Sequence, residues 1–292
     1  MKRELLSDAT FKKGFLLQDP NAGTLDRNVT KYIHFGNERC TPVWYMAQWW
    51  TPFNFKDAPI VKSGDVYSID NESRHYSINT KTGRFEMGLD ASLEYKTLYD
   101  DVRRKIATPW SHFLIEQDFE KPAKVTKIKA LRAHVKFKIN EVTLDKPELF
   151  DPSIHAAQLL WYVTINSKRG LYSPAGRNFI WFGIPLYDSR SKELPDQCHP
   201  DIGSPGSTNC LICSLGTKDY LPNGVEIGKE YVIDIDIWPK VKEAIEIAKK
   251  EGIFREDEDE KLNINYMNFG WELPGSYKVS SVVEELSLEV EE

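Results

Sequence analysis

Runs in which apolar and polar residues alternate one by one constrain the fold of this chain more than any other feature. In 131–140, for example, Ala133, Val135, Phe137 and Ile139 fall on one parity, and polar or charged residues fall on the other. Comparable runs occupy 83–95, 158–166, 178–187, 231–238 and 262–273. Alternation with a period of two is typical of strands with one buried face, and the turn-forming clusters between such runs favour antiparallel sheets over βαβ units. The sequence therefore predicts an all-β fold in which these ranges are mostly strand.

One segment has helical periodicity instead. Pro239 suits a first helical position, and the apolar residues from Val241 to Ala248 recur at i, i+3, i+4 and i+7. Gly252 is placed to end the helix. We predict one helix longer than two turns, at residues 239–251.

The chain is predicted to form a single domain, residues 1–292. Its 41% apolar residues supply a core, and all-β sandwiches of this size often form one unit. We find no internal repeat and no long linker, and 194–222, rich in Pro, Gly, Ser and Asp, is predicted to be one long loop between strands. Long strands with long connections favour a jelly-roll β-sandwich over a seven-stranded immunoglobulin arrangement.

Charge and motifs exclude several classes of function. The chain has 44 acidic and 38 basic side chains, which argues against a nucleic-acid partner. No stretch approaches 18 uninterrupted apolar residues, so no membrane-spanning helix is expected. The absence of a Gly-rich phosphate loop and of GxSxG disfavours nucleotide and serine-hydrolase chemistry. No signal peptide is visible at the start, so we expect either an intracellular protein or a secreted chain whose signal has been removed.

Three of the four cysteines, Cys198, Cys210 and Cys213, lie within sixteen residues, and His199 adjoins the first. A Cys-His pair followed by Cys-x-x-Cys is one way to build a structural zinc site that fixes a loop without a core. The alternatives are reduced thiols or a Cys198–Cys210 disulfide. We expect no cofactor to be required beyond this candidate zinc ion.

Two carboxylates lie in segments that alternate as strands do, Glu116 in 110–119 and Glu272 in 266–275. Burying an ionised Glu among apolar residues costs several kcal/mol unless it is paired or lines a wet cleft. His112 and Asp118 share the face of Glu116, and Asn268 shares the face of Glu272. Facing each other across a cleft, the two carboxyl groups would match the pair that glycosidases use. The alternative is that each accepts hydrogen bonds from the backbone or an Arg on a solvated face.

Aromatic residues make up 12% of the chain, including 8 Trp. Sugar rings stack their C–H faces on indole, and nearby polar groups bond the hydroxyls. The predicted sugar-binding residues are therefore the aromatics Trp49, Trp50, Trp238 and Trp271 with the polar side chains Gln48, His112, Asp118 and Asn268. The alternative is that most of these Trp side chains belong to the core.

A resemblance to a known family rests on the segment LNINYMNFGWELPGS, residues 262–276. It is similar to the acid/base strand of family 12 glycoside hydrolases, which carry Gly-x-Glu-Pro near the C-terminus. Gly270 and Glu272 match that pattern, with Leu273 inserted before Pro274. The family's nucleophile motif, Glu followed by aliphatic-Met-aliphatic-Trp, has no match at Glu116. The resemblance implies a concanavalin-like jelly roll and an acid/base role for Glu272.

We therefore expect a carbohydrate-active protein whose partner is an oligosaccharide or polysaccharide. The sharper hypothesis is a glycoside hydrolase of the retaining endo-β-glycanase type, with Glu272 as acid/base and Glu116 as nucleophile. One alternative is a non-catalytic, lectin-like glycan-binding protein that uses the same groove. The other is a structural or interaction protein whose Trp residues all lie in the core.

Overall fold

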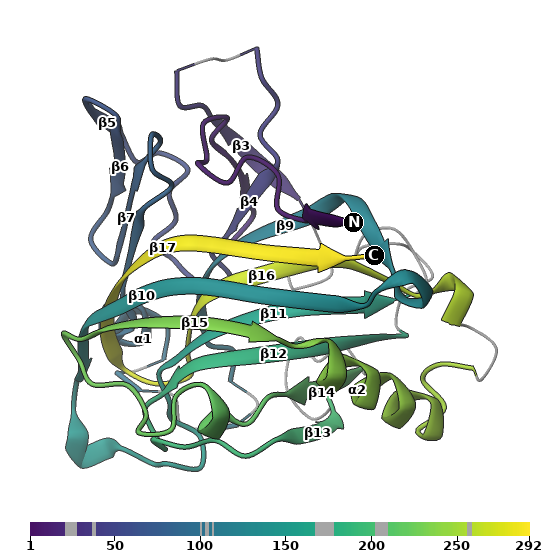
Figure 1. The fold of residues 1–292 in the computed structure, drawn as a ribbon. Helices are drawn as coiled ribbons and strands as arrows, with labels where there is room; N and C mark the ends of the chain where they lie inside the picture. The colour runs from purple at the N-terminus through teal and green to yellow at the C-terminus, as the bar shows by residue number, and fades with distance from the viewer. Residues whose placement is uncertain are drawn as a thin grey trace.

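The computed structural model describes residues 1–20, 28–36, 39–99, 101–102, 105–106, 108–166, 178–201, 210–255 and 259–292. These residues form two large sheets (Figure 1). The eight-stranded sheet contains, in spatial order, β15 (Glu230–Asp236), β10 (Ala130–Leu144), β17 (Tyr277–Glu291), β8 (Phe85–Asp90), β7 (Arg74–Asn79), β6 (Val66–Asp70) and β5 (Ile60–Ser63), with β1 (Lys2–Glu4) paired to β17. The nine-stranded sheet contains β13 (Gln197–Pro200), β14 (Leu211–Ser214), β12 (Phe179–Asp188), β11 (Gln158–Asn166), β16 (Asn263–Leu273), β9 (Ser111–Lys124), β4 (Trp44–Ala47), β2 (Phe15–Gln18) and β3 (Val29–Ile33).

The two sheets bury one large apolar cluster to which both contribute. Val135 and Phe137 of β10 and Phe113 and Ile115 of β9 belong to it, and each is at most 1% exposed. The alternation seen in the sequence thus places one parity of each long strand in the shared core. The prediction of an all-β jelly-roll sandwich is confirmed.

Most of the predicted strand ranges are strand in the structure, but 83–95 is only half correct. The strand β8 ends at Asp90, and helix α1 (Ala91–Leu98) follows at once. The Asp90 carboxylate caps the helix by accepting the backbone N–H of Ser92 at 3.1 Å. Ala91, Glu94 and Tyr95 are buried, at i, i+3 and i+4. The buried acidic side chain at position 94 concealed the helical pattern.

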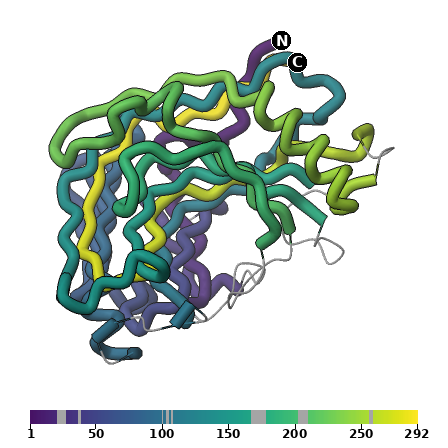
Figure 2. The backbone as a smooth tube through the Cα atoms, turned by 90° about the horizontal axis from the view of Figure 1, so that it is seen from below, coloured from purple at the N-terminus to yellow at the C-terminus, as the bar shows by residue number. Residues whose placement is uncertain are grey.

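The predicted helix at 239–251 is present as α2 (Trp238–Lys250), which buries Val241, Ala244, Ile245 and Ala248. Figures 1 and 2 place α1 and α2 at opposite ends of the sandwich. The prediction that 194–222 is one loop was wrong in part, because β13 and β14 lie within it; residues 202–209 lie outside the described part of the chain. None of the described helices is long and apolar enough to span a bilayer.

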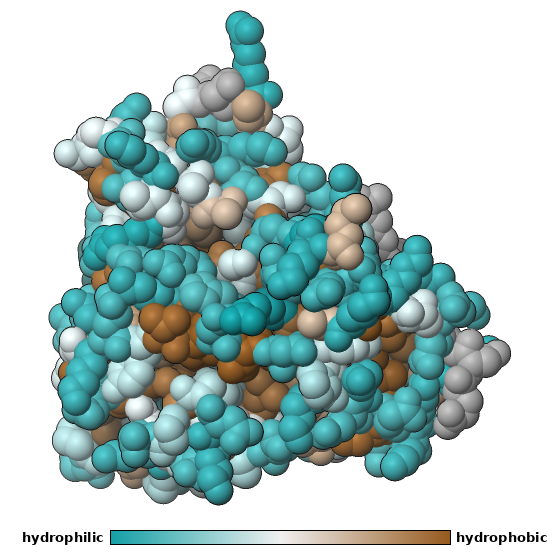
Figure 3. Space-filling model, viewed as in Figure 1, coloured by the Kyte–Doolittle hydropathy of each residue, from teal (hydrophilic) through white to brown (hydrophobic). Residues whose placement is uncertain are grey.

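The outer surface of the eight-stranded sheet is strongly polar. Figure 3 shows hydrophilic residues across most of the side that carries β17, β10 and β15, with apolar groups reaching the surface near its middle. Ion pairs cross between these strands, including Arg132 with Asp234 at 2.5 Å and Lys136 with Glu284 at 3.2 Å. Among the described residues of this surface, no carboxylate is buried.

Candidate functional site

The candidate site lies on the outer face of the nine-stranded sheet, the face turned away from the shared core. On this face Glu272 of β16 is directly opposite His112 of β9, and Glu116 of β9 is directly opposite Asn268 of β16. Directly opposite residues in an antiparallel pair point to the same side of the sheet. The intervening residues, such as Phe113 and Trp271, point into the core.

At one end of the face, Glu272 contacts two side chains of the β9 region. Its Oε2 atom lies 3.4 Å from His112 Nε2 and accepts a hydrogen bond from Trp110 Nε1 at 3.3 Å. His112 Nδ1 lies 2.8 Å from the carbonyl oxygen of Trp110. The imidazole also stacks against Trp110, with ring centroids 5.3 Å apart. These contacts define the Glu272 cluster, namely Glu272, His112 and Trp110.

The charge state of Glu272 follows from opposing effects. Burial alone would raise its pKa, but the charge of His112 and the hydrogen bonds from His112 and Trp110 together outweigh burial, so the pKa of Glu272 is lower than usual. The Glu272 side chain is 17% exposed, and Trp110 is half-buried. The cluster therefore presents an ionised carboxylate beside an aromatic ring, and both groups keep access to solvent.

At the other end of the face, Glu116 is fully buried. Its Oε2 atom accepts a hydrogen bond from Gln18 Nε2 at 2.5 Å. Gln18 Oε1 accepts a hydrogen bond from Trp49 Nε1 at 3.2 Å, and the Trp49 ring lies 5.3 Å from the ring of His112. Gln18, Trp49 and His112 thus form a continuous link between the two carboxylates.

The register separates the two predicted catalytic residues. Glu272 pairs with His112, which lies four residues before Glu116 on β9. At 3.4 Å per residue this offset is about 13–14 Å along the strand. Each carboxylate is held by a different set of side chains, Glu116 by Gln18 and Glu272 by the β9 start. The residue directly across from Glu272 on β9 is a histidine, whereas the hypothesis of a catalytic pair needs a second carboxylate nearby.

The other predicted sugar-binding residues are scattered. Trp271 is 0% exposed and donates through Nε1 to Ser281 Oγ at 3.0 Å. Trp238 is the first residue of α2 and is 6% exposed, so both side chains belong to the core and their predicted role was wrong. Gln48 is also fully buried, and its Oε1 accepts the backbone N–H of Phe55 at 2.9 Å, so its predicted role was wrong as well.

Besides His112, four of the predicted sugar-binding residues lie on or beside the outer face. Trp49 is 2% exposed and packs in a small apolar cluster with Leu114, against which the half-buried Trp50 also packs. Asn268 is 5% exposed, and the half-buried Asp118 is directly opposite Tyr266. Of these residues, Trp50 and Asp118 keep partial exposure.

The cysteine residues do not gather as a zinc site would require. Cys198 and Cys213, directly opposite each other on β13 and β14, form a disulfide, so their sulfurs are not thiolate ligands. His199 follows Cys198 on a strand and therefore points to the other face. Cys210 packs in an outer-face cluster with Trp181 and Tyr266. Within the described residues, no three His, Cys, Asp or Glu side chains are placed to hold a metal ion. The Cys198–Cys213 pairing contradicts the alternative Cys198–Cys210 disulfide, and the structural zinc site stays a prediction.

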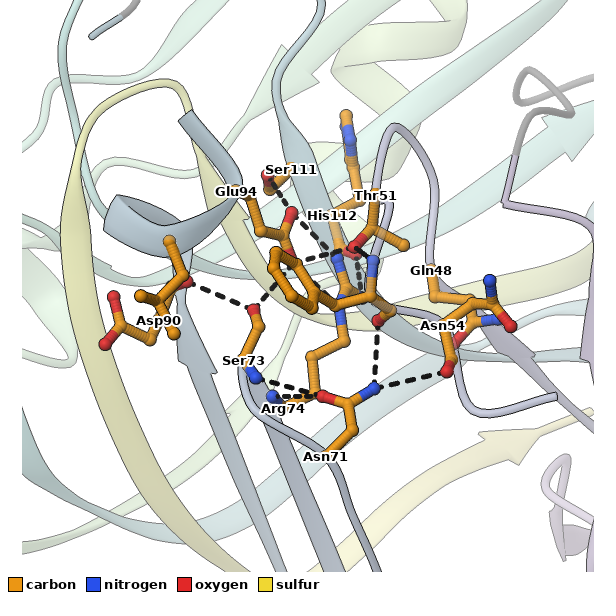
Figure 4. Close-up of polar contacts among 12 residues, drawn as sticks. Gln48, Thr51, Asn54, Asn71, Ser73, Arg74, Asp90, Glu94, Ser111 and His112 are labelled. Carbon is orange, nitrogen blue, oxygen red and sulfur yellow. Dashed lines mark hydrogen bonds and ion pairs between the residues drawn. The ribbon is translucent and has the colours of Figure 1, made fainter. Parts of the chain in front are cut away.

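A polar network that sequence reasoning missed lies beside the Glu272 cluster (Figure 4). Its centre is Glu94 of α1, which is 1% exposed. One carboxylate oxygen accepts from Thr51 Oγ1 at 2.8 Å, Ser73 Oγ at 2.8 Å and Arg74 Nε at 3.0 Å. The other accepts from Ser111 Oγ and from Arg74 Nη2 at 3.3 Å. The donors come from separate segments of the chain, so no short sequence motif predicts the network.

Similarity to known proteins is found at the level of structure. No protein-family model matches the sequence, and no curated protein does. Solved structures of jelly-roll glycoside hydrolases are similar to it. A family 12 xyloglucanase from Bacillus licheniformis has a TM-score of 0.47 and 9% identity, covering 84% of this chain and 100% of that chain. A cellulase derived from Cel12A of Rhodothermus marinus has a TM-score of 0.43 and 12% identity, covering 85% and 100%. A family 11 xylanase from Neocallimastix patriciarum has a TM-score of 0.40 and 9% identity, covering 85% and 100%.

Proposed function

We propose that the outer face of the nine-stranded sheet binds a β-linked polysaccharide, with the Glu272 cluster as its main point of contact. The observation that carries this proposal is the solvent-accessible pairing of an ionised carboxylate with the half-buried Trp110 ring. A carboxylate accepts hydrogen bonds from sugar hydroxyls, and an indole face stacks on the C–H groups of a pyranose ring. Carbohydrate recognition needs both kinds of group in one place.

Hydrolysis of the bound glycan is the second candidate function. The lowered pKa of Glu272 favours it, because a carboxylate that stays ionised at neutral pH suits the nucleophile of a glycosidase. The same property disfavours the acid/base role expected from the sequence, since a general acid must hold a proton. Retaining chemistry also needs carboxyl groups about 5–5.5 Å apart, whereas the register offset of Glu116 is about 13–14 Å.

The test is a binding assay on purified protein with a panel of β-glucans, xylans and mannans. Glu272→Gln should weaken binding about tenfold or more, because hydrogen bonds to a charged group contribute about 1.5–3 kcal/mol. Trp110→Ala should weaken it through loss of stacking. Matched controls are Glu289→Gln and Tyr231→Ala on the eight-stranded sheet, which should bind as the unmodified protein does.

Three outcomes decide between the functions. Binding that is lost in both Glu272→Gln and Trp110→Ala but kept in the controls supports the proposal. Reducing ends released by the unmodified protein and not by Glu272→Gln support hydrolysis as well. If no polysaccharide of the panel binds, or if both site variants bind normally, the proposal is wrong.

A further inference from the structure

Helix α1 contacts both strands of the Glu272 cluster from the core side. Leu273 of β16 and Ser111 of β9 are directly opposite each other, and they are the immediate neighbours of the Glu272–His112 pair. Two consecutive residues of α1 bond to this rung: Tyr95 donates through its hydroxyl to the Leu273 carbonyl at 2.7 Å, and Glu94 accepts from Ser111 Oγ. The helix therefore holds the two strands at the level of the site.

Arg74 extends this attachment to His112 itself. Its Nη1 atom donates to the His112 carbonyl at 2.7 Å, while Nε and Nη2 bond Glu94 (Figure 4). The guanidinium also lies 5.2 Å from the ring centre of Phe113, the next residue of β9. Because Arg74 belongs to β7, the backbone around His112 is fixed to the opposite sheet.

Burial makes these contacts rigid. The side chains of Arg74 and Glu94 are 0% and 1% exposed, and Tyr95 is 1% exposed. A buried carboxylate surrounded by donors cannot exchange them for water, and a planar guanidinium fork accepts few alternative geometries. A small shift of α1 would therefore move both strands together with it.

We propose that Glu94 and Tyr95 act as positioning residues that keep Glu272 within contact distance of His112 and Trp110. We call this pair the α1 clamp. The clamp acts through Ser111 and Leu273 on the backbone and touches no ligand. Its effect on ligand binding rests on the proposed function, whereas its effect on the Glu272–His112 contact does not.

The direct test compares Tyr95→Phe with Tyr99→Phe. Both changes remove one hydroxyl from the α1 region, but only the Tyr95 hydroxyl bonds Leu273. The readout is the pKa of the Glu272 carboxyl, followed by carboxyl-carbon NMR during a pH titration. Loosening the contact with His112 and Trp110 leaves burial as the main influence, so Tyr95→Phe should raise the Glu272 pKa and Tyr99→Phe should not.

A second variant tests the Glu94 side of the clamp. Ser111→Ala removes one donor from Glu94 without changing any charge, and it should also raise the Glu272 pKa. With any polysaccharide that the unmodified protein binds, both variants should bind about three- to tenfold more weakly than Tyr99→Phe, as expected for a lost hydrogen bond. Melting temperatures of all three variants separate this effect from general destabilisation.

The outcomes distinguish this inference from the proposed function. A raised Glu272 pKa in Tyr95→Phe and Ser111→Ala supports the clamp even if no polysaccharide of the panel binds. If both variants melt at lower temperature but leave the Glu272 pKa where it is in the unmodified protein, the two residues only stabilise the fold and the inference is wrong.

Discussion

Replacing Arg74 with Met should destabilise the protein by about 3–5 kcal/mol, because the change leaves the Glu94 carboxylate buried without its cationic partner. The two side chains are 0% and 1% exposed, so water cannot take the place of the guanidinium. Met resembles the aliphatic part of Arg in length and adds no polar atom, which limits the packing loss. The variant also removes the hydrogen bond to the His112 carbonyl.

An exposed ion pair on the surface provides a control for the buried Arg74–Glu94 pair. Arg132 bonds Asp234 through both Nε and Nη2, at 2.5 and 2.6 Å, but the two side chains are 53% and 37% exposed. Exposed ion pairs contribute about 0–1 kcal/mol, since water and salt screen both partners. Arg132→Met should therefore change the free energy of unfolding by less than about 1 kcal/mol.

Denaturant unfolding, followed by tryptophan fluorescence and far-UV circular dichroism, measures both variants on one scale. Adding Glu94→Gln to Arg74→Met should recover part of the loss, because the double variant no longer buries an unpaired charge. If Arg74→Met and Arg132→Met lose similar free energies, or if the double variant is less stable than Arg74→Met, the reasoning from the buried charge is refuted.

Three further predictions concern other parts of the molecule. The pKa of Glu272 is lower in the folded protein, so the contacts of its carboxylate stabilise the fold above the unfolded-state pKa. This stabilisation is lost as the pH falls through the folded-state pKa. Glu272→Gln should therefore make stability depend less on pH in the acid range, measured as melting temperature against pH. Removing the disulfide with Cys198→Ser and Cys213→Ser should lower the free energy of unfolding by about 3 kcal/mol, as expected for a sequence separation of 15. Thiol titration of the denatured, unreduced protein should detect two of the four cysteines. Detection of all four would contradict the pairing. Gly270 has a φ of +150°, and a Cβ atom there would lie 2.2 Å from the Phe113 carbonyl oxygen, so Gly270→Ala should cost more than about 2 kcal/mol; an unchanged melting temperature would contradict this geometry.

The strands of the predicted ranges could be found because a single physical signal determines them. Alternation in 131–140 decides both the conformation of β10 and the face that enters the core, and no distant residue changes that result. The α1 helix could not be predicted in the same way. Its buried positions include Glu94, and a charged residue is tolerated there because Arg74 of β7 pairs with it. Tertiary contacts therefore override the local pattern at that point.

In the candidate site, too, the local pattern predicts some features and tertiary contacts decide the others. Strand parity correctly groups Glu272 with Asn268 and Glu116 with His112, but it cannot give the register between β9 and β16. That register sets Glu272 opposite His112 and offsets Glu116. Because Trp271 and Glu272 are adjacent on a strand, they point to opposite faces of the sheet, and the face of Trp271 is the core. Aromatic content alone could not separate sugar-binding side chains from core side chains, because both uses favour the same residues.

The network around Glu94 also has a consequence for local opening of the native state. Its members come from the segment after β4, the β6–β7 turn, α1 and the start of β9, so separating any one of them leaves a charged or polar group unpaired in the interior. Asn71 Oδ1 in the same turn accepts the amides of Ser73 and Arg74, at 3.0 and 2.8 Å. These amides should therefore exchange with deuterium in one cooperative event together with those of α1. Exchange at this end of the sandwich then reports the opening of a whole unit, with a free energy well above that of an ordinary surface turn.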